Sequence, residues 1–290
     1  METIRTIAWM KEQARAARME HRIVGLVPTM GALHTGHMAL VERCSKECAP
    51  MYVSIFLNPT QFGANEDLAK YPSTLESDIE KLAAARVDGL FLPDAVEIYP
   101  RGFSTYVDVE GLSNRLEGKS RPGHFRGVAT VVLKLLEIVK PHYAYFGRKD
   151  AQQVRVIQQM VRDLNLDSEI VVCPIVREAD GLAMSSRNAY LDAKERKAAG
   201  VLYRSLQSAA AETMRGEHSA VKIIAAIQAV LSGEPMAQVD YAEIVDAETF
   251  EPVTRIGRTS YALLAVRIGK TRLIDNLLIW AEDGDLRPDL

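Results

Sequence analysis

The sequence has few cysteines, little net charge and no long apolar run, and each shortage argues against a class of protein. Its three cysteines, Cys44, Cys48 and Cys173, are odd in number and lack the spacing of a disulfide framework, which argues against a small secreted scaffold. The 35 basic and 38 acidic residues give a net charge of -3, so there is no broad basic surface for duplex nucleic acid. No segment approaches the ~20 apolar residues of a membrane span.

The first 22 residues also lack the features of a targeting segment. They contain no apolar stretch long enough for a signal peptide, and the acidic residues Glu2, Glu12 and Glu20 are atypical of a transit peptide. We therefore expect a cytoplasmic protein that begins with an amphipathic surface helix. Apolar residues make up 48% of the 290 residues, which is enough to bury a substantial core in one or two domains.

Short apolar runs alternate with helical patterns over residues 1–176. The runs, most of them ended by Gly or Pro, are expected to form buried strands at 23–27, 51–57, 90–92, 143–146 and 170–176. Helical periodicity lies between them at 37–48, 75–85, 127–139 and 151–164. This alternation predicts an α/β fold, a Rossmann-like doubly wound parallel sheet that binds its ligand beyond the carboxyl ends of the strands.

The pattern changes after residue 176. Helices are expected at 193–214 and 219–231, and strands at 239–245, 261–268 and 271–279. This order predicts a smaller α+β domain over residues 177–290, separate from the domain 1–176. The smaller domain is a candidate lid over the ligand.

The sharpest local signal is the segment PTMGALHTGH, residues 28–37, which follows the first strong strand and opens a helix. Gly31 and Gly36 let the backbone turn tightly and approach a ligand. The N-terminus of a helix offers unpaired N–H groups to a phosphate. His34 and His37 are three residues apart, so both imidazoles can face the same anion.

Three other interpretations of this segment compete with phosphate binding. A P-loop has similar glycine spacing, but His37 and Met38 stand where Lys and Ser or Thr are required. A catalytic zinc site needs three protein ligands, and no third ligand is suitably spaced from His34 and His37. The alternative that stays open is a pair of histidines that only cap the helix and pack.

Two later segments also suit phosphate. Phe146-Gly147-Arg148-Lys149-Asp150 ends a strand and opens a helix, so Lys149 can neutralise phosphate charge, although a solvated charge pair explains it equally well. Met184-Ser185-Ser186-Arg187 follows a turn at Asp180-Gly181. Its hydroxyls and guanidinium match phosphate oxygens, but such a run also suits an ordinary loop or helix start.

Taken together, the segments resemble the pantothenate synthetase family, within the nucleotidyltransferase superfamily that carries an HxGH-type motif. The matching segments, in order and spacing, are PTMGALH (28–34), FLNPTQF (56–62), Tyr71-Pro72, RPGHFRGV (121–128), Phe146-Gly147, Lys149-Asp150 with Gln152-Gln153, and MSSRN (184–188). The resemblance covers about residues 20–190, and the chain length also fits.

The resemblance implies an AMP-forming pantoate–β-alanine ligase that uses ATP and Mg²⁺ and forms a pantoyl-adenylate. The residues implied to contact ATP are Met30, Gly31, Ala32, Leu33, His34, Thr35, Gly36, His37, Gly147, Arg148, Lys149, Asp150, Val176, Met184, Ser185, Ser186 and Arg187. The implied catalytic residues are His34, His37 and Lys149. His37 would either protonate the departing pyrophosphate or act as an electrostatic donor only.

The resemblance also implies the remaining ligands and partners. Gln61, Gln153 and Asn58 would line the pantoate pocket, with Gln61 also near β-alanine; an amide offers a donor and an acceptor without adding charge. Asp78 would hold Mg²⁺ through water. The family usually has an acidic residue at the position of Arg148, and we expect this departure to alter activity little. A homodimer without nucleic-acid or membrane partners is expected.

Two other functions are open on the sequence. One is another small-molecule nucleotidyltransferase. The amides of Gln61 and Gln153 argue against it. The other is a non-catalytic nucleotide-binding module, which leaves the joint occurrence of the two histidines, Lys149 and the Ser-Ser-Arg segment unexplained. A tRNA synthetase would need an anticodon-binding domain or a basic tract, and the sequence has neither.

Overall fold

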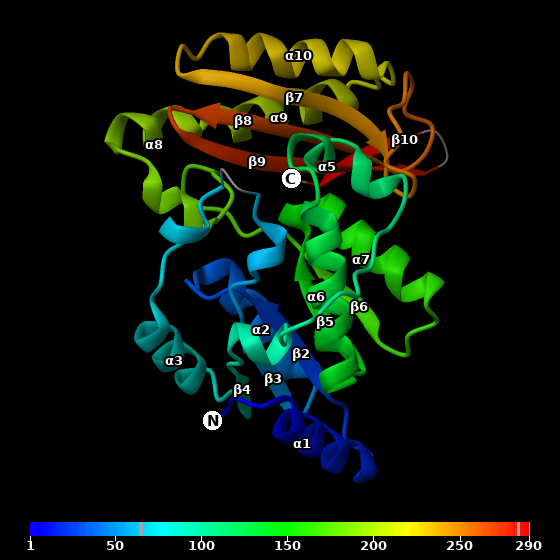
Figure 1. The fold of residues 1–290 in the computed structure, drawn as a ribbon. Coiled ribbons are helices and arrows are strands. Elements are labelled where there is room, and N and C mark those ends of the chain that lie inside the picture. Colours follow the sequence, from blue (N-terminus) through cyan, green and yellow to red (C-terminus); the bar gives the residue numbers. More distant parts are fainter. Residues whose placement is uncertain (64–65, 283–284, 290) are drawn as a thin grey trace. The chain divides into compact units, whose positions relative to one another are not determined.

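The computed structural model describes residues 1–63, 66–282 and 285–289, which form two compact units, each with its own sheet (Figure 1). The first unit contains residues 1–148 and 152–174, and the second contains residues 149–151 and 175–290. In the part of the chain that is described, no helix has the length and apolar character needed to cross a bilayer.

The first two-thirds of the chain alternate strands with helices. In chain order the elements are β1 (Glu2–Ile4), α1 (Ile7–Met19), β2 (Gly25–Thr29), α2 (Thr35–Glu47), β3 (Met51–Ile55), η1 (Pro59–Gln61), η2 (Leu68–Lys70), α3 (Leu75–Ala84), β4 (Gly89–Phe91), α4 (Ala95–Ile98), η3 (Leu112–Asn114), α5 (Glu117–Ser120), α6 (His124–Val139), β5 (Tyr143–Gly147), η4 (Arg148–Asp150), α7 (Ala151–Asp163) and β6 (Glu169–Cys173), where η marks a 3₁₀ helix.

The sheet of the first unit has six strands in the order β1-β4-β3-β2-β5-β6, and all neighbouring strands are parallel. The predicted Rossmann-like parallel sheet is therefore confirmed. From β2 the chain adds β3 and then β4 on one side, and later places β5 on the other side of β2. The topological switch point thus lies between β2 and β5, where ligands bind beyond the carboxyl ends of the strands.

Helices cover both faces of this sheet. On one face, Leu40 of α2 and Leu82 of α3 pack with Val27 and Val53 in a buried cluster. Successive side chains of a strand point to opposite faces, so the buried Leu26 faces the other side. There α6 contacts β2, and α1 contacts α6.

The second unit has an antiparallel sheet of four strands in the order β10-β9-β8-β7. Its elements are η5 (Ser186–Tyr190), α8 (Ala193–Ala199), α9 (Val201–Met214), α10 (Ala220–Ser232), β7 (Ala237–Asp246), β8 (Ser260–Ile268), β9 (Thr271–Glu282) and β10 (Asp285–Asp289). The expected α+β character of this part is confirmed.

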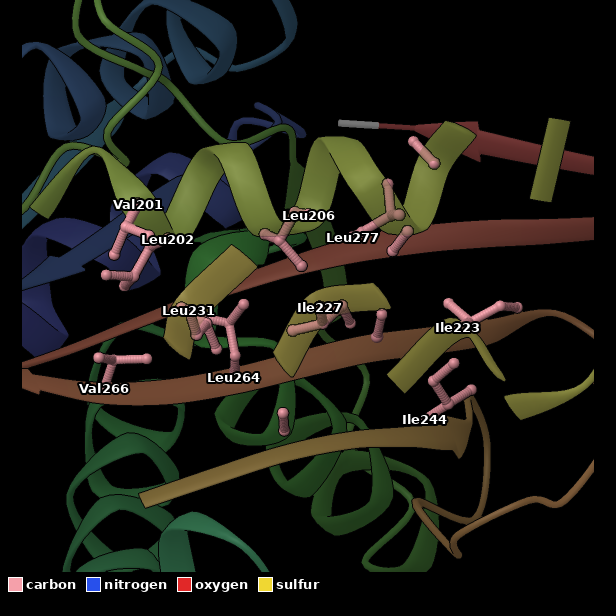
Figure 2. Close-up of a cluster of buried hydrophobic side chains, with 14 of the residues drawn as sticks. Val201, Leu202, Leu206, Ile223, Ile227, Leu231, Ile244, Leu264, Val266 and Leu277 are labelled. Atoms are coloured by element: carbon pink, nitrogen blue, oxygen red, sulfur yellow. The ribbon is translucent and has the colours of Figure 1, made fainter. Parts of the chain in front are cut away.

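The helices α9 and α10 contact each other and pack on one face of that sheet. Figure 2 shows the core between these two helices and the sheet. Leu206 of α9, Ile227 of α10 and Leu264 of β8 are fully buried there. Each such side chain contributes about 1.5–3 kcal/mol through burial of apolar surface.

Three local predictions were wrong. Residues 2–4 form β1 rather than the start of a helix, and they pair with β4. The single helix expected at 193–214 is two helices, α8 and α9, with Gly200 between them. The strand β10 was not predicted, and it pairs with β9.

Candidate active site

The loop after β2 turns the chain from the sheet into α2. Gly31 and Ala32 both have positive φ, 84° and 51°. A Cβ atom on Gly31 would lie 3.2 Å from Cγ2 of Ile55 and 3.4 Å from Oδ2 of Asp78, so glycine meets both the backbone and the space requirement. The left-handed conformation of Ala32 costs of order 1 kcal/mol, which the surrounding contacts must offset.

The helix α3 holds this loop from the side. The N–H of Leu33 donates to Oδ1 of Asp78 at 2.8 Å, and Nζ of Lys81 donates to the carbonyl of Leu33 at 2.7 Å. The hydroxyl of Thr74 also donates to Oδ1 of Asp78. Asp78 as a residue is only 1% exposed. Both backbone groups of Leu33 are therefore fixed, immediately before the first histidine. Sequence reasoning assigned no role to Lys81.

The two histidines cap α2 reciprocally. Nδ1 of His34 accepts a hydrogen bond from the Gly36 N–H at 3.1 Å, and Nδ1 of His37 accepts one from the His34 N–H at 3.4 Å. The ring centroids lie 4.0 Å apart. A neutral imidazole that accepts at Nδ1 carries its proton at Nε2, so the hydrogen bonds assign two Nε2–H donors beside the helix N-terminus. The histidines do cap the helix, and the same geometry suits an anion.

The amides of Asn58 and Gln61 form a network with the loop. Nδ2 of Asn58 donates to Oε1 of Gln61 at 3.0 Å and to the Gly127 carbonyl at 3.2 Å. Nε2 of Gln61 donates to Sδ of Met30 at 3.1 Å. The hydroxyl of Tyr99, another residue that sequence reasoning missed, donates to Oδ1 of Asn58 at 2.8 Å. The orientation of the Gln61 amide is thereby fixed, with its donor toward the loop after β2.

A buried histidine supports Gln61 through its main chain. Nε2 of His124 lies 3.1 Å from Nη1 of Arg121, and a guanidinium can only donate, so Nδ1–H of His124 donates to the Gln61 carbonyl at 2.9 Å. Burial and the charge of Arg121 lower the pKa of His124 to about 4. Arg121 in turn pairs with Glu66 at 2.6 Å. His124 is therefore neutral at neutral pH.

The other predicted residues of the first unit lie near the end of β5 and in α7. Gly147 ends β5, and Arg148, which follows it, is only 6% exposed, so its guanidinium places a positive charge inside the protein. Gln153 is half-buried in the first turn of α7. Its neighbour Gln152 is structural, because it bonds the Glu117 N–H at 3.0 Å and the carbonyl groups of two further residues.

In the second unit, residues 176–184 fold back on themselves. The N–H of Met184 donates to the Val176 carbonyl at 2.9 Å, and an antiparallel bridge one residue further in extends the pairing. Ser185 caps η5 by accepting from the Arg187 N–H at 3.3 Å, and Ser186 begins that helix. The structure thus brings together Val176 and the segment 184–187, which sequence analysis assigned to the nucleotide.

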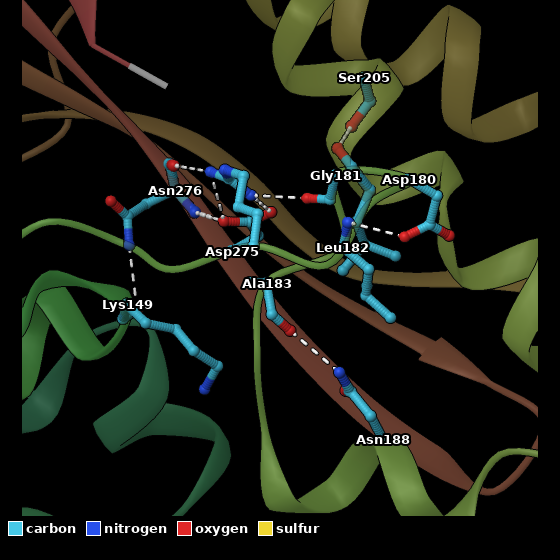
Figure 3. Close-up of polar contacts among 11 residues, drawn as sticks. Lys149, Asp180, Gly181, Leu182, Ala183, Asn188, Ser205, Asp275 and Asn276 are labelled. Carbon is cyan, nitrogen blue, oxygen red and sulfur yellow. Dashed lines mark hydrogen bonds and ion pairs between the residues drawn. The ribbon is translucent and has the colours of Figure 1, made fainter. Parts of the chain in front are cut away.

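Lys149 also belongs to the second unit. Its Nζ lies 3.7 Å from Oδ2 of Asp150, and its backbone carbonyl accepts a hydrogen bond from Nδ2 of Asn276 at 3.0 Å (Figure 3). Asn276 lies in β9, where sequence reasoning found no functional residue. The signal available in the sequence was the polar pair Asp275-Asn276 between the apolar residues 273–274 and 277–280.

Direct metal ligands are not clustered. Across residues 1–63, 66–282 and 285–289, no group of three or more His, Cys, Asp or Glu could hold a metal ion. Oδ2 of Asp78 is buried and has no hydrogen-bond partner. One unsatisfied carboxylate oxygen fits contact with a water of a hydrated Mg²⁺ ion, which binds mainly to substrate phosphates and water.

A parallel sheet with its switch point beside β2, followed by a helix whose N-terminus carries two imidazole donors, defines a Rossmann-like protein of the nucleotide-binding class. Comparison with known families narrows this class. The family model described as pantoate-beta-alanine ligase matches residues 2–278. The chain belongs to the pantoate–β-alanine ligase family, whose members are ligases.

Curated relatives and solved structures agree with this assignment. The pantothenate synthetase of Koribacter versatilis is 52% identical over 281 residues, covering 97% of each chain. That of Thermotoga neapolitana is 53% identical over 279 residues, covering 96% of this chain and all of the relative. The crystal structure of the Thermus thermophilus pantothenate synthetase has a TM-score of 0.91 at 46% identity, covering 96% of this chain and 99% of that one.

A further solved relative carries ligands. The pantoate–β-alanine ligase of Francisella tularensis, in complex with beta-gamma ATP and beta-alanine, is 37% identical with a TM-score of 0.79. The match covers 96% of this chain and 97% of that one.

Proposed function

We propose that this chain condenses (R)-pantoate with β-alanine to pantothenate, using ATP and releasing AMP and pyrophosphate through a pantoyl-adenylate. The observation that carries the proposal is the family match over residues 2–278. The complex of the Francisella tularensis relative with beta-gamma ATP and beta-alanine supports ATP and β-alanine as substrates here.

The reaction needs ATP because a carboxylate is a poor acylating agent, since oxide or hydroxide would have to leave. A carboxylate oxygen of pantoate attacks the α-phosphorus of ATP, the bond to the bridging oxygen breaks, and pyrophosphate leaves. The amine of β-alanine then attacks the acyl carbon of the mixed anhydride, loses a proton, and AMP departs with the carboxylate oxygen. The protein must align the substrates and neutralise phosphate charge, so positioning and electrostatics dominate the rate.

The two Nε2–H groups of His34 and His37 are the proposed donors to the phosphates. Their Nδ1 atoms are used in capping, which supports a fixed ring orientation and a proton at Nε2 of each ring. His37 is proposed to stabilise the departing pyrophosphate by donating a hydrogen bond from Nε2. Its alternative role, as a proton donor, requires the imidazolium, in which Nδ1 is protonated and no longer accepts from the His34 N–H. Met30 to Gly36 are proposed to line the nucleotide through the backbone of the loop and the helix start.

The amides of Gln61 and Gln153 are the proposed ligands of pantoate. A thioether is a weak acceptor, so the Nε2–H that Gln61 donates to Met30 is readily given up to a substrate hydroxyl or carboxylate. Asn58 holds Oε1 of Gln61 and thereby keeps this donor directed toward the loop. The same geometry supports the proposed proximity of Gln61 to β-alanine.

The remaining contacts to the nucleotide would be supplied by residues 147–150 at the end of β5 and by the segment 176–187. Gly147, Arg148, Lys149 and Asp150 are proposed to contact the nucleotide, with the amine of Lys149 on the phosphates. Val176 would meet the adenine through its backbone, and residues 184–187 would close over the triphosphate. Mg²⁺ would bridge phosphate oxygens and reduce their charge, with Asp78 holding one of its waters.

Three broader features belong to the same proposal. The proposed domain boundary lies at 176/177. Residues 177–290 would act as a lid that excludes water, which would otherwise hydrolyse the adenylate. A homodimer in the cytoplasm is proposed from the resemblance to the family.

The test is a coupled pyrophosphate assay with the purified protein. Pyrophosphate should appear when ATP, Mg²⁺ and pantoate are present, and pantothenate should form only after β-alanine is added. His37→Ala and Lys149→Ala should each lower turnover by about 100-fold or more while the protein stays folded. Pyrophosphate release that does not require pantoate would reject the proposed substrate, and near-normal turnover of both variants would reject the assigned roles.

A further inference from the structure

The strand β9 contains two consecutive polar residues that are almost completely buried. Asp275 is 2% exposed and Asn276 is 1% exposed, between apolar neighbours. Burying a polar side chain costs free energy unless it is hydrogen-bonded. Successive side chains of a strand point to opposite faces, so the two residues reach different segments of the second unit.

Asp275 binds the 176–184 fold-back at Arg177. Its carboxylate pairs with Arg177 through two contacts, Nη1 to Oδ2 at 2.7 Å and Nη2 to Oδ1 at 3.2 Å. Nη1 of Arg177 also donates to the Gly181 carbonyl at 3.1 Å, and the guanidinium lies 4.7 Å from the ring centroid of Tyr203. Burial raises the pKa of Asp275, and Arg177 opposes that rise. The pair fixes both the start of this segment and its turn at Gly181. Figure 3 shows Asp275 and the Gly181 carbonyl.

Asn276 binds the chain at Lys149. Its Nδ2 donates to the Lys149 carbonyl at 3.0 Å, so the bond fixes the main chain of Lys149 and leaves its amine to reach elsewhere (Figure 3). The Lys149 side chain is 19% exposed. One strand therefore holds two segments assigned to the nucleotide, which are far apart in the sequence.

We propose that Asp275 and Asn276 are the positioning pair of this enzyme, and that Asn276 acts on turnover through Lys149. The inference rests on the proposed function, in which the Lys149 amine neutralises phosphate charge. A displacement of about 1 Å in a catalytic group can lower the rate about 100-fold. Loss of the Asn276 bond frees the Lys149 main chain, so turnover falls although no group that touches substrate is removed.

The test uses Asn276→Ala, and Asn276→Leu, which keeps the branching and number of side-chain heavy atoms without a donor. Each variant is made alone and in combination with Lys149→Ala, and kcat and the KM for ATP are measured together with the melting temperature. We expect either substitution to lower kcat about 10- to 100-fold. In the Lys149→Ala background the same substitution should cause no further loss, because the amine that it positions is already absent.

A matched control is Thr213→Val, which removes a buried side-chain hydrogen bond elsewhere in the second unit. The Thr213 hydroxyl, 1% exposed as a residue, donates to the Ala210 carbonyl at 2.8 Å in α9. This variant should lose stability but keep kcat within about twofold of wild type, because a lost hydrogen bond that supports no catalytic group affects folding only. Wild-type kcat for both Asn276 variants, or losses that multiply in the double variants, would overturn the proposal.

A second readout keeps this proposal separate from the proposed function. If the wild-type protein releases no pyrophosphate with pantoate, the proposed function fails, and the positional claim is then tested by acetylation of the amines with acetic anhydride. The rate at Lys149, measured by mass spectrometry relative to the exposed Lys222, should change severalfold in Asn276→Leu. An unchanged relative rate would contradict the claim.

Discussion

Gly127→Ala would test how closely turnover depends on the position of the Gln61 segment. The helix α6 approaches η1 so closely that a Cβ atom on Gly127 would lie 2.4 Å from the Thr60 carbonyl oxygen and 2.7 Å from Cα of Gln61. Both atoms are backbone, so no side chain can simply rotate away. Ordinary contact begins near 3.4 Å, so the segment must move by about 1 Å.

Two effects on stability oppose each other in this variant. Overpacking costs about 1–3 kcal/mol, whereas replacing a helical glycine with alanine gains up to about 1 kcal/mol. The net loss should therefore be about 0–3 kcal/mol, whereas a shift of about 1 Å in Gln61 should lower kcat/KM for pantoate about 100-fold. The hydrogen bond from Asn58 to the Gly127 carbonyl would be disturbed as well.

The assay is pyrophosphate release at varied pantoate concentration, with the melting temperature measured on the same samples. Gly257→Ala is the matched control, because a Cβ atom there would meet no atom within 4 Å. The control should behave as wild type in both measurements. A Gly127→Ala variant with wild-type kcat/KM for pantoate would refute the placement of Gln61 in the pantoate site.

Three further outcomes follow from the contacts of the first unit. The folded pKa of His124, about 4, lies below its ordinary value of 6.5, so the unfolded chain binds more protons between these pH values. The free energy of unfolding should therefore fall by up to about 3 kcal/mol from pH 6.5 to pH 4. In His124→Gln, the free energy of unfolding measured by urea titration should depend less on pH over this range. Asp78→Ala should lower the free energy of unfolding by about 2 kcal/mol because it leaves the Leu33 N–H unpaired. Asp78→Asn keeps that acceptor and should raise only the Mg²⁺ concentration needed for half-maximal activity. Equal stability losses of the two variants in chemical denaturation would contradict this. His34→Asn should keep the melting temperature because asparagine also caps helices. Its turnover should fall about 100-fold because the Nε2–H donor is lost. Full activity in the pyrophosphate assay would show that His34 only caps the helix.

The sheet of the first unit could be predicted because its strands are short apolar runs ended by Gly or Pro. The β1 strand escaped prediction because three residues carry too little pattern, and its pairing with β4 joins segments that are distant in the sequence. The helix expected at 193–214 kept its apolar periodicity across Gly200, so the break between α8 and α9 left no clear signal.

The sequence offers candidate site residues only where they lie in contiguous motifs. The histidine loop and the segment 184–187 are of this kind. Lys81, Tyr99 and Asn276 act through contacts across 48, 41 and 127 positions of the chain, and no local pattern encodes such distances. A polar residue between apolar neighbours, as at Asn276, is a signal that sequence inspection can use in such cases, because burial of such a residue requires a hydrogen-bond partner.

The most direct test of the central claim follows one oxygen atom. Attack of the pantoate carboxylate on the α-phosphorus of ATP leaves a carboxylate oxygen bonded to phosphorus, and that oxygen departs with AMP when β-alanine attacks the acyl carbon. Pantoate labelled with ¹⁸O in its carboxylate should therefore give AMP that carries one ¹⁸O atom by mass spectrometry. AMP without the label, formed together with pantothenate, would contradict activation as the acyl-adenylate.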